Sequence, residues 1–230
     1  MNRLYLILFY LCVVGGVSAM DFVKVGNPDN KYLKSGLGKV SYEYEISVYE
    51  VTNDDYCKFL NNVASEKDPY KLFSSIMSDH FWGGILRSWE KDKFVYRVKY
   101  GYEHKPVVGV TWNSAVRFIN WLHYNSSKLE SGVSFSDFVP LTEGDTVFGA
   151  YNTEDLDDPK KAVISCRTRN TKARYWLPNR DEWIKACFFE GDEWNEKWIA
   201  EGANYYDPYE GWRYPYPHIK DVGMGVERSF

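Results

Sequence analysis

The sequence predicts an α+β fold with short antiparallel strands, about three helices and long irregular loops. Two stretches alternate apolar and polar residues with the period of a half-buried strand. Three further stretches repeat apolar residues with the period of an amphipathic helix, and each begins at a capping residue. Strands and helices do not alternate regularly, and long stretches show neither period. This order is typical of α+β proteins, and such long loops usually carry function.

The first strand is predicted over residues 40–51, because apolar side chains recur there at every second position. Thr52 then caps a helix, and Asp55 three residues later completes a capping box. The apolar face of this helix is formed by residues spaced three and four apart, namely Tyr56, Phe59, Leu60 and Val63.

A second strand is predicted over residues 93–100, after an irregular stretch at residues 68–89. Residues 107–110 are expected to form a short apolar strand that enters a second helix, capped by Thr111 or Asn113. The inner face of this helix is predicted to comprise Ala115, Phe118, Ile119 and Leu122, with Trp121 beside them.

A third short strand is predicted over residues 174–177. Pro178 ends it, Asn179 caps the following helix, and Glu182 at the third helical position closes a second capping box. Trp183, Ala186, Cys187 and Glu190 are expected to share one face of this helix.

The remaining stretches are polar or aromatic. Residues 126–169 are predicted to be loop, and their acidic cluster at residues 154–158 lacks the ligand order of an EF-hand calcium site. The aromatic side chains of residues 204–217 form either a binding surface or part of the core.

The first nineteen residues are typical of a secretory signal peptide. Arg3 precedes an apolar run at residues 4–14, and residues 17–19 are small. The run is shorter than the ~20 residues that a membrane-spanning helix needs. We therefore expect cleavage between Ala19 and Met20, a secreted or periplasmic location, no membrane span, and one domain over residues 20–230.

Charge and cysteine content narrow the function further. Without Arg3 the chain has 27 basic and 32 acidic residues, which argues against a nucleic-acid partner. Cys57, Cys166 and Cys187 remain after cleavage. In an oxidising compartment they would form one disulfide and one thiol, or else all three are small buried hydrophobes.

Ten residues of the capping segments occur in a fixed order: Glu50, Thr52, Asn53, Pro106, Trp112, Trp121, Leu177, Pro178, Glu182 and Trp183. The order and spacing of these residues resemble the motifs of the formylglycine-generating enzymes, also called sulfatase-modifying factors. The resemblance extends over residues 22–217. The resemblance implies a variant of the C-type lectin-like fold.

Enzymes of this family oxidise a sulfatase cysteine to formylglycine with a pair of cysteines near their C-terminus. Residues 222–230 hold no such pair, and the C-terminal part of the domain is accordingly expected to be incomplete. The resemblance implies that such a pair holds copper, and because the thiolate is the metal ligand, copper is not expected without these cysteines. A second branch of the family uses histidine-bound iron, but the four histidines are scattered at His80, His104, His123 and His218.

The resemblance also concerns single residues outside the capping segments. Asn204 resembles an asparagine that helps to hold calcium. Cys187 matches a position that can form a disulfide with the C-terminal tail, and the candidate disulfide within this chain joins Cys166 and Cys187.

We therefore expect an exported sulfatase-modifying-factor-like protein that binds a polypeptide or a surface ligand without catalysis. The alternatives are a formylglycine-generating oxidase acting on a sulfatase cysteine, or a truncated fragment of one.

Overall fold

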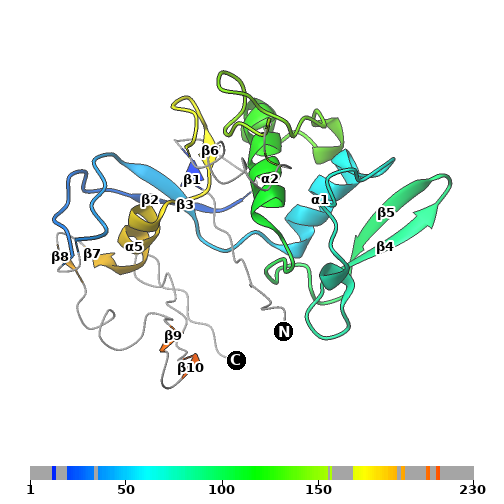
Figure 1. Cartoon of the computed structure of the whole chain (residues 1–230), viewed down its shortest axis with the longest axis horizontal. Coiled ribbons are helices and arrows are strands. Elements are labelled where there is room, and N and C mark those ends of the chain that lie inside the picture. The colour runs from blue at the N-terminus through cyan, green and yellow to red at the C-terminus, as the bar shows by residue number, and fades with distance from the viewer. Residues whose placement is uncertain are drawn as a thin grey trace. The chain divides into compact units, whose positions relative to one another are not determined.

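The computed structural model of the 230-residue chain is shown in Figure 1. It describes residues 12–13, 20–33, 36–154, 156, 168–190, 193–194, 206–207 and 211–212. These residues combine helices with short antiparallel strands, which confirms the α+β prediction. In the described part of the chain, no helix is both long and apolar enough to cross a membrane.

The chain divides into two compact units, each built from two separate stretches of sequence. Unit 1 comprises Met1–Asp21 and Tyr49–Leu177, and unit 2 comprises Phe22–Val48 and Pro178–Phe230. Each unit is described by itself.

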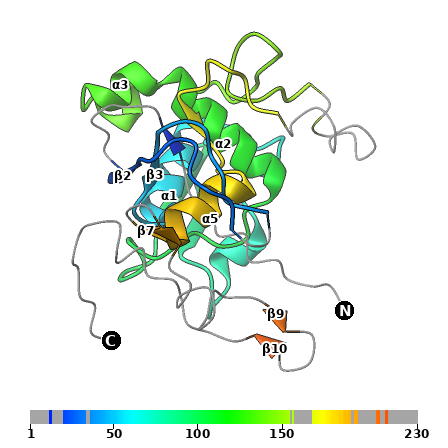
Figure 2. The same ribbon diagram turned by 90° about the vertical axis from the view of Figure 1, so that its left-hand side faces the viewer.

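Two helices form the centre of unit 1, α1 (Asn53–Val63) and α2 (Trp112–Tyr124). They lie side by side (Figures 1 and 2). Their predicted apolar faces meet in an aromatic cluster, in which the ring centroid of Phe59 lies 5.2 Å from Phe118 and 5.3 Å from Trp121. Trp121 was expected only beside this face, yet it is fully buried. The reason is a second aromatic pair, Phe135 and Phe138, which covers its other side.

The hairpin of β4 (Ile85–Glu90) and β5 (Lys93–Val98) extends from this centre (Figure 1). The second predicted strand is thus confirmed, although it ends two residues early. The prediction of irregular chain over residues 68–89 is wrong for β4 and for the 3₁₀ helix η1 (Ser75–Ser78). Lys91 and Asp92 form the hairpin turn with positive φ values of 48° and 61°, which glycine and asparagine usually adopt. A turn was therefore not predicted at these residues.

The remaining elements of unit 1 are short. The strand predicted at residues 107–110 is absent; only Pro106 forms an isolated bridge, to Thr52. Gly109 has a φ of 73°, which interrupts extended backbone. The stretch predicted as loop after α2 contains α3 (Ser126–Glu130) and η2 (Phe135–Asp137). β1 (Cys12–Val13) pairs antiparallel with β6 (Tyr175–Trp176).

The described residues of unit 2 form three strand pairs and one helix. β2 (Phe22–Val25) pairs antiparallel with β3 (Tyr44–Ser47), so the strand predicted at residues 40–51 is confirmed only in its middle. The helix α5 (Arg180–Phe188) begins at the predicted cap. Two further antiparallel pairs join β7 (Phe189–Glu190) to β8 (Glu193–Trp194) and β9 (Tyr206–Asp207) to β10 (Gly211–Trp212).

The predicted apolar face of α5 is wrong except for Ala186. Glu182, Lys185, Ala186 and Phe188 are the buried positions, whereas Trp183 and Cys187 are half-buried, and Glu190 lies beyond the helix in β7. A buried lysine was not expected, but its ammonium group donates to the backbone carbonyl of Asn27 at 2.7 Å, which satisfies a group that would otherwise be costly to bury.

Candidate functional site: two apolar loops held by aspartates

Two family-motif residues at the start of α1, Thr52 and Asn53, form hydrogen bonds with backbone groups. Thr52 accepts from the backbone N–H of Asp55 at 3.2 Å, as the capping box predicts. The buried side chain of Asn53 donates to the carbonyls of Tyr102 and Lys105 at 3.0 and 2.9 Å. Because Nδ2 reaches two carbonyls some fifty residues away, Asn53 fastens α1 to the segment that leads to Pro106.

Gly84 lies directly against this asparagine. A Cβ atom built on Gly84 would be 2.4 Å from Asn53 Cγ and 2.4 Å from Nδ2. We expect Gly84→Ala to reduce the free energy of unfolding by about 1–3 kcal/mol, the usual range for overpacking. Urea unfolding measures this, with Gly26→Ala as the control, since its nearest atom would be 3.9 Å away. Equal midpoints for the two variants would contradict the prediction.

The other motif residues of unit 1 differ in their surroundings. Trp121 is buried, and its Nε1 donates to Asn62 Oδ1 at 2.8 Å. Trp112 is 43% exposed at the first position of α2. Glu50 is half-buried, and Leu177 is buried next to β6.

The second capping box is also present, in unit 2. Asn179 accepts from Glu182 N at 2.9 Å, and Glu182 Oε2 accepts from Asn179 N at 2.7 Å. The hydroxyl of Tyr42 donates to the other carboxylate oxygen at 2.5 Å. Both carboxylate oxygens of Glu182 therefore accept a hydrogen bond within unit 2, which gives this residue a structural role.

The surroundings of Cys57 disfavour metal binding by its thiol. Cys57 is buried, and burial raises the pKa of its thiol to about 11, so the thiolate that binds a metal is scarce at neutral pH. Cys187 is half-buried in the last turn of α5. Cys166, Asn204 and Ala19 lie outside the described residues, whereas Met20 lies inside them.

No group of three metal-ligating side chains occurs among the residues with a described position. His123 is engaged by the backbone, since its Nδ1 accepts from Arg174 N at 3.1 Å. Burial, with a smaller contribution from the Arg174 charge, lowers the pKa of His123.

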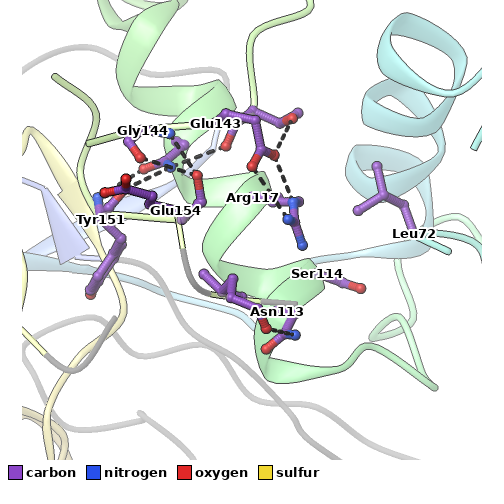
Figure 3. A network of polar contacts seen from close by, with 12 residues as sticks. Leu72, Asn113, Ser114, Arg117, Glu143, Gly144, Tyr151 and Glu154 are labelled. Carbon is purple, nitrogen blue, oxygen red and sulfur yellow. Dashed lines mark hydrogen bonds and ion pairs between the residues drawn. The ribbon is translucent and has the colours of Figure 1, made fainter. Parts of the chain in front are cut away.

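A polar network on α2 fastens the loop of residues 142–153 (Figure 3). Arg117 is 1% exposed, and its Nε donates to Glu143 Oε1 at 2.7 Å. The guanidinium carbon lies 3.9 Å from the centroid of the Tyr70 ring. Thr142 also donates to Glu143 Oε1, at 3.1 Å. The first residues of the loop are thereby held against the helix.

Asn120 holds the other end of this loop. Its Oδ1 accepts from the backbone N–H groups of Ala150 and Tyr151, both at 2.9 Å. Its Nδ2 donates to the carbonyls of Thr142 and Tyr151 at 3.1 and 3.0 Å. One buried side chain thus makes four hydrogen bonds to the loop backbone, which is the full capacity of an amide.

The tip of this loop exposes two large apolar side chains. Val147 and Phe148 are 64% and 67% exposed. Asp145 Oδ1 accepts from both of their backbone N–H groups at 2.6 Å, and Asp145 N donates to the carbonyl of Phe148 at 2.9 Å. We name residues 145–149, which end in Gly149, the Asp145 loop.

A second loop has the same construction. Asp79 Oδ1 accepts from the backbone N–H groups of Phe81 and Trp82 at 2.9 and 3.1 Å. These two side chains are 78% and 67% exposed. Gly83 N and Lys99 Nζ donate to the carbonyl of Asp79 at 3.2 and 2.6 Å. We name residues 79–83 the Asp79 loop.

Both loops share a sequence pattern that our sequence analysis missed: aspartate, any residue, two large apolar residues and glycine. The aspartate side chain accepts hydrogen bonds from backbone N–H groups two and three residues later, as aspartate often does in turns. These bonds order the backbone of the two apolar residues, whose side chains are exposed to solvent. The arrangement suits binding, because ordered backbone presents apolar area at a low entropic cost.

The aspartate hydrogen bonds predict a pH dependence of the Asp145 loop. The backbone N–H groups of Phe148 and Val147 lower the pKa of Asp145 below 3.8. A lowered pKa in the folded state stabilises the loop fully above the unfolded value, about 3.9, and this contribution is lost as the pH falls through the folded pKa. The amide resonances of Val147 and Phe148 should therefore titrate below pH 3.8. Asp145→Asn should abolish this titration, and a midpoint above 3.8 would contradict the prediction.

Comparisons with known proteins place the whole arrangement in one family. The family model described as the sulfatase-modifying factor enzyme 1-like domain matches residues 12–224, which include segments of both units. Comparison with curated proteins and comparison with solved structures each gave no match. Because the family model covers far more than half of the chain, the chain belongs to the sulfatase-modifying factor family.

Proposed function

We propose that this protein is an exported, non-catalytic member of its family that binds a polypeptide. The observation that carries the proposal is the pair of exposed apolar side chains that an aspartate holds at the tip of each loop. Exposed apolar groups that gather on ordered loops are typical of interaction surfaces.

The energetics favour such a role. Burying one side chain of the size of Val or Phe contributes about 1.5–3 kcal/mol. Each loop presents two such side chains, and its backbone is already ordered by the aspartate and by the rest of unit 1. Binding therefore loses little conformational freedom of these loops.

The chemistry of the cysteines disfavours the oxidase alternative. The family reaction uses two thiols near the C-terminus, whereas residues 188–230 contain no cysteine. Cys57 lies in α1 and its thiol has a raised pKa. Oxidation of a sulfatase cysteine is accordingly not proposed for this chain.

A peptide selection tests the binding role. The purified full chain would be immobilised and exposed to phage-displayed random dodecapeptides, and an enriched peptide would be synthesised for titration. We expect Phe148→Ser or Trp82→Ser to weaken binding about tenfold or more, since ~1.4 kcal/mol corresponds to tenfold. Tyr32→Ser removes another exposed aromatic ring and serves as the control. It should change the affinity by less than about threefold relative to the unmodified chain. Failure to enrich any peptide, or equal affinity of all variants, would refute the proposal.

The same preparation tests the oxidase alternative. It would be incubated with copper, oxygen and a peptide that contains the C-x-P-x-R pattern of sulfatases, and the peptide mass would be measured. We expect an unchanged mass. Formation of the aldehyde would show catalysis and overturn the non-catalytic role.

Export has its own test. Expression of the full chain followed by sequencing of the N-terminus of the exported protein should give Met20 as the first residue. An intact N-terminus would contradict the cleavage. Cleavage at this place would remove Cys12 and Val13, which pair with β6.

A further inference from the structure

The hairpin of β4 and β5 has two edges, and its register determines which backbone groups face outward. Glu90 pairs with Lys93 across the two-residue turn. Directly opposed residues in an antiparallel pair are alternately bonded and non-bonded to each other, and a two-residue turn begins this alternation with a bonded pair. Arg87 and Trp89 on β4 therefore direct their N–H and C=O groups outward, as do Phe94 and Tyr96 on β5.

The outer edge of β5 is covered by α1 and the residues that follow it. Phe94 N donates to the carbonyl of Ser65 at 2.6 Å. The side chain of Asn61 accepts from Tyr96 N at 3.0 Å and donates to Tyr96 O at 2.9 Å, so its amide takes the place of a neighbouring strand. These bonds agree with the outward direction that the register assigns.

The outer edge of β4 has no such cover. Among the described residues, none bonds the outward backbone groups of Arg87 or Trp89. The side chains of Leu86, Arg87 and Trp89 are exposed. The pairing runs without a bulge from Ile85 to Glu90, and this strand contains no proline. Bulges and prolines are the usual protection of an edge against added strands, so β4 is able to accept one.

The positive charge of the hairpin favours an acidic segment as the added strand. Residues 85–98 hold four basic and two acidic side chains, although the whole chain has a net charge of −4. Glu90 is already paired with Arg97. The guanidinium carbon of Arg87 lies 4.6 and 4.8 Å from the ring centroids of Phe73 and Phe94, which holds this cation beside the open edge. A carboxylate opposite Arg87 would complement it.

The Asp79 loop leads directly into β4. Gly84 joins the loop to the strand, and Lys99 N donates to Gly84 O at 2.8 Å, continuing the hairpin pairing. A strand laid along β4 would thus meet Phe81 and Trp82 at one end and Trp89 at the other. Backbone bonds would give affinity, and the flanking side chains would give selectivity.

We propose that β4 accepts an extended acidic segment of a partner polypeptide as a third strand of the hairpin sheet. The proposal rests on the polypeptide-binding role and names where and how the polypeptide binds. A second copy of this chain fits less well, because two hairpins with the same positive charge would repel each other.

Residue-resolved amide hydrogen exchange of the full chain tests the added strand. The probe is a synthetic peptide that alternates valine and glutamate, at low millimolar concentration, and the control replaces each glutamate by lysine. The acidic probe should slow exchange of the Arg87 and Trp89 amides about tenfold or more, whereas the bonded Phe94 and Tyr96 amides change little. Unchanged exchange at Arg87 and Trp89, or equal protection by the lysine peptide, would overturn the proposal.

Two matched variants test the charge. Arg87→Glu and Lys91→Glu change the net charge equally, but Lys91 lies in the turn and not beside the edge. Arg87→Glu should weaken binding of the acidic probe about tenfold, ~1.4 kcal/mol, and Lys91→Glu should have a much smaller effect. Equal weakening would mean that only overall charge matters, which contradicts the proposal. Protection of β4 together with dimer formation by light scattering, without the probe, would assign the edge to a second copy instead.

The outcome also separates this inference from the proposed function. A phage-selected peptide that depends on Phe148 or Trp82 but not on Arg87 would sustain polypeptide binding and refute the added strand. A chain that binds neither selected peptides nor the acidic probe would refute both.

Discussion

Asn120→Ala is expected to reduce the free energy of unfolding by about 4 kcal/mol. The substitution removes four hydrogen bonds and leaves the backbone groups of Thr142, Ala150 and Tyr151 without their partner. Each buried backbone group left unsatisfied costs about 1–3 kcal/mol, and relaxation of the loop recovers part of the total. Urea unfolding with the full chain measures the loss.

Tyr124→Phe is the control for this prediction. It removes one hydrogen bond to the same loop, from the tyrosine hydroxyl to the carbonyl of Glu143 at 2.8 Å, at an exposed position. Its effect should be about 1 kcal/mol or less. Because Asn120 also fastens the Asp145 loop, we expect Asn120→Ala to weaken a peptide that depends on Phe148. If Asn120→Ala were as stable as Tyr124→Phe, the hydrogen bonds of the Asn120 side chain would not be needed to hold the loop, which would contradict the prediction.

Trp121→Ala is expected to reduce the free energy of unfolding by about 3–5 kcal/mol, the usual range for a buried tryptophan. The ring centroids of Phe59, Phe118, Phe135 and Phe138 lie 5.2–5.8 Å from Trp121. Loss of the indole would leave a cavity among these rings and remove the bond to Asn62.

Trp112→Ala is the matched comparison, since both tryptophans belong to the family motif and to α2. Trp112 is 43% exposed, so we expect a loss of about 1 kcal/mol or less, as for most surface substitutions. Denaturant unfolding of both variants gives the difference directly. A larger loss for Trp112 would mean that the core is not centred where the structure places it.

The local parts of the fold could be predicted from the sequence. Both capping boxes, at Thr52 and at Asn179, are present as expected, because a cap bonds only residues three positions apart. Three of the four residues predicted for the apolar face of α1, Tyr56, Phe59 and Leu60, are buried because their spacing places them on one face, whereas Val63 is half-buried. The family followed from the same local segments.

The predictions were wrong where a turn lacks its usual residues or where a distant segment decides burial. β4 was missed because it pairs with β5 across a local turn that contains neither glycine nor asparagine. The face of α5 was wrong because Lys185 is buried by a bond to Asn27, 158 positions away. The pattern of the two aspartate loops was available in the sequence, but the exposure of Phe81 and Phe148 was not.

The sequence by itself therefore determined the helices α1, α2 and α5 and their caps, because each follows from residues within one or two helical turns. It also determined the family, through the order of these short segments along the chain. Tertiary structure alone decided that Trp121 is core and Trp112 is surface, that Asn120 clamps a loop thirty residues away, and that β5 is covered while β4 is open. The physical reason is that the burial of a side chain and the completion of its hydrogen bonds depend on which distant segment packs against it. The spacing of neighbouring residues in the sequence does not specify that segment.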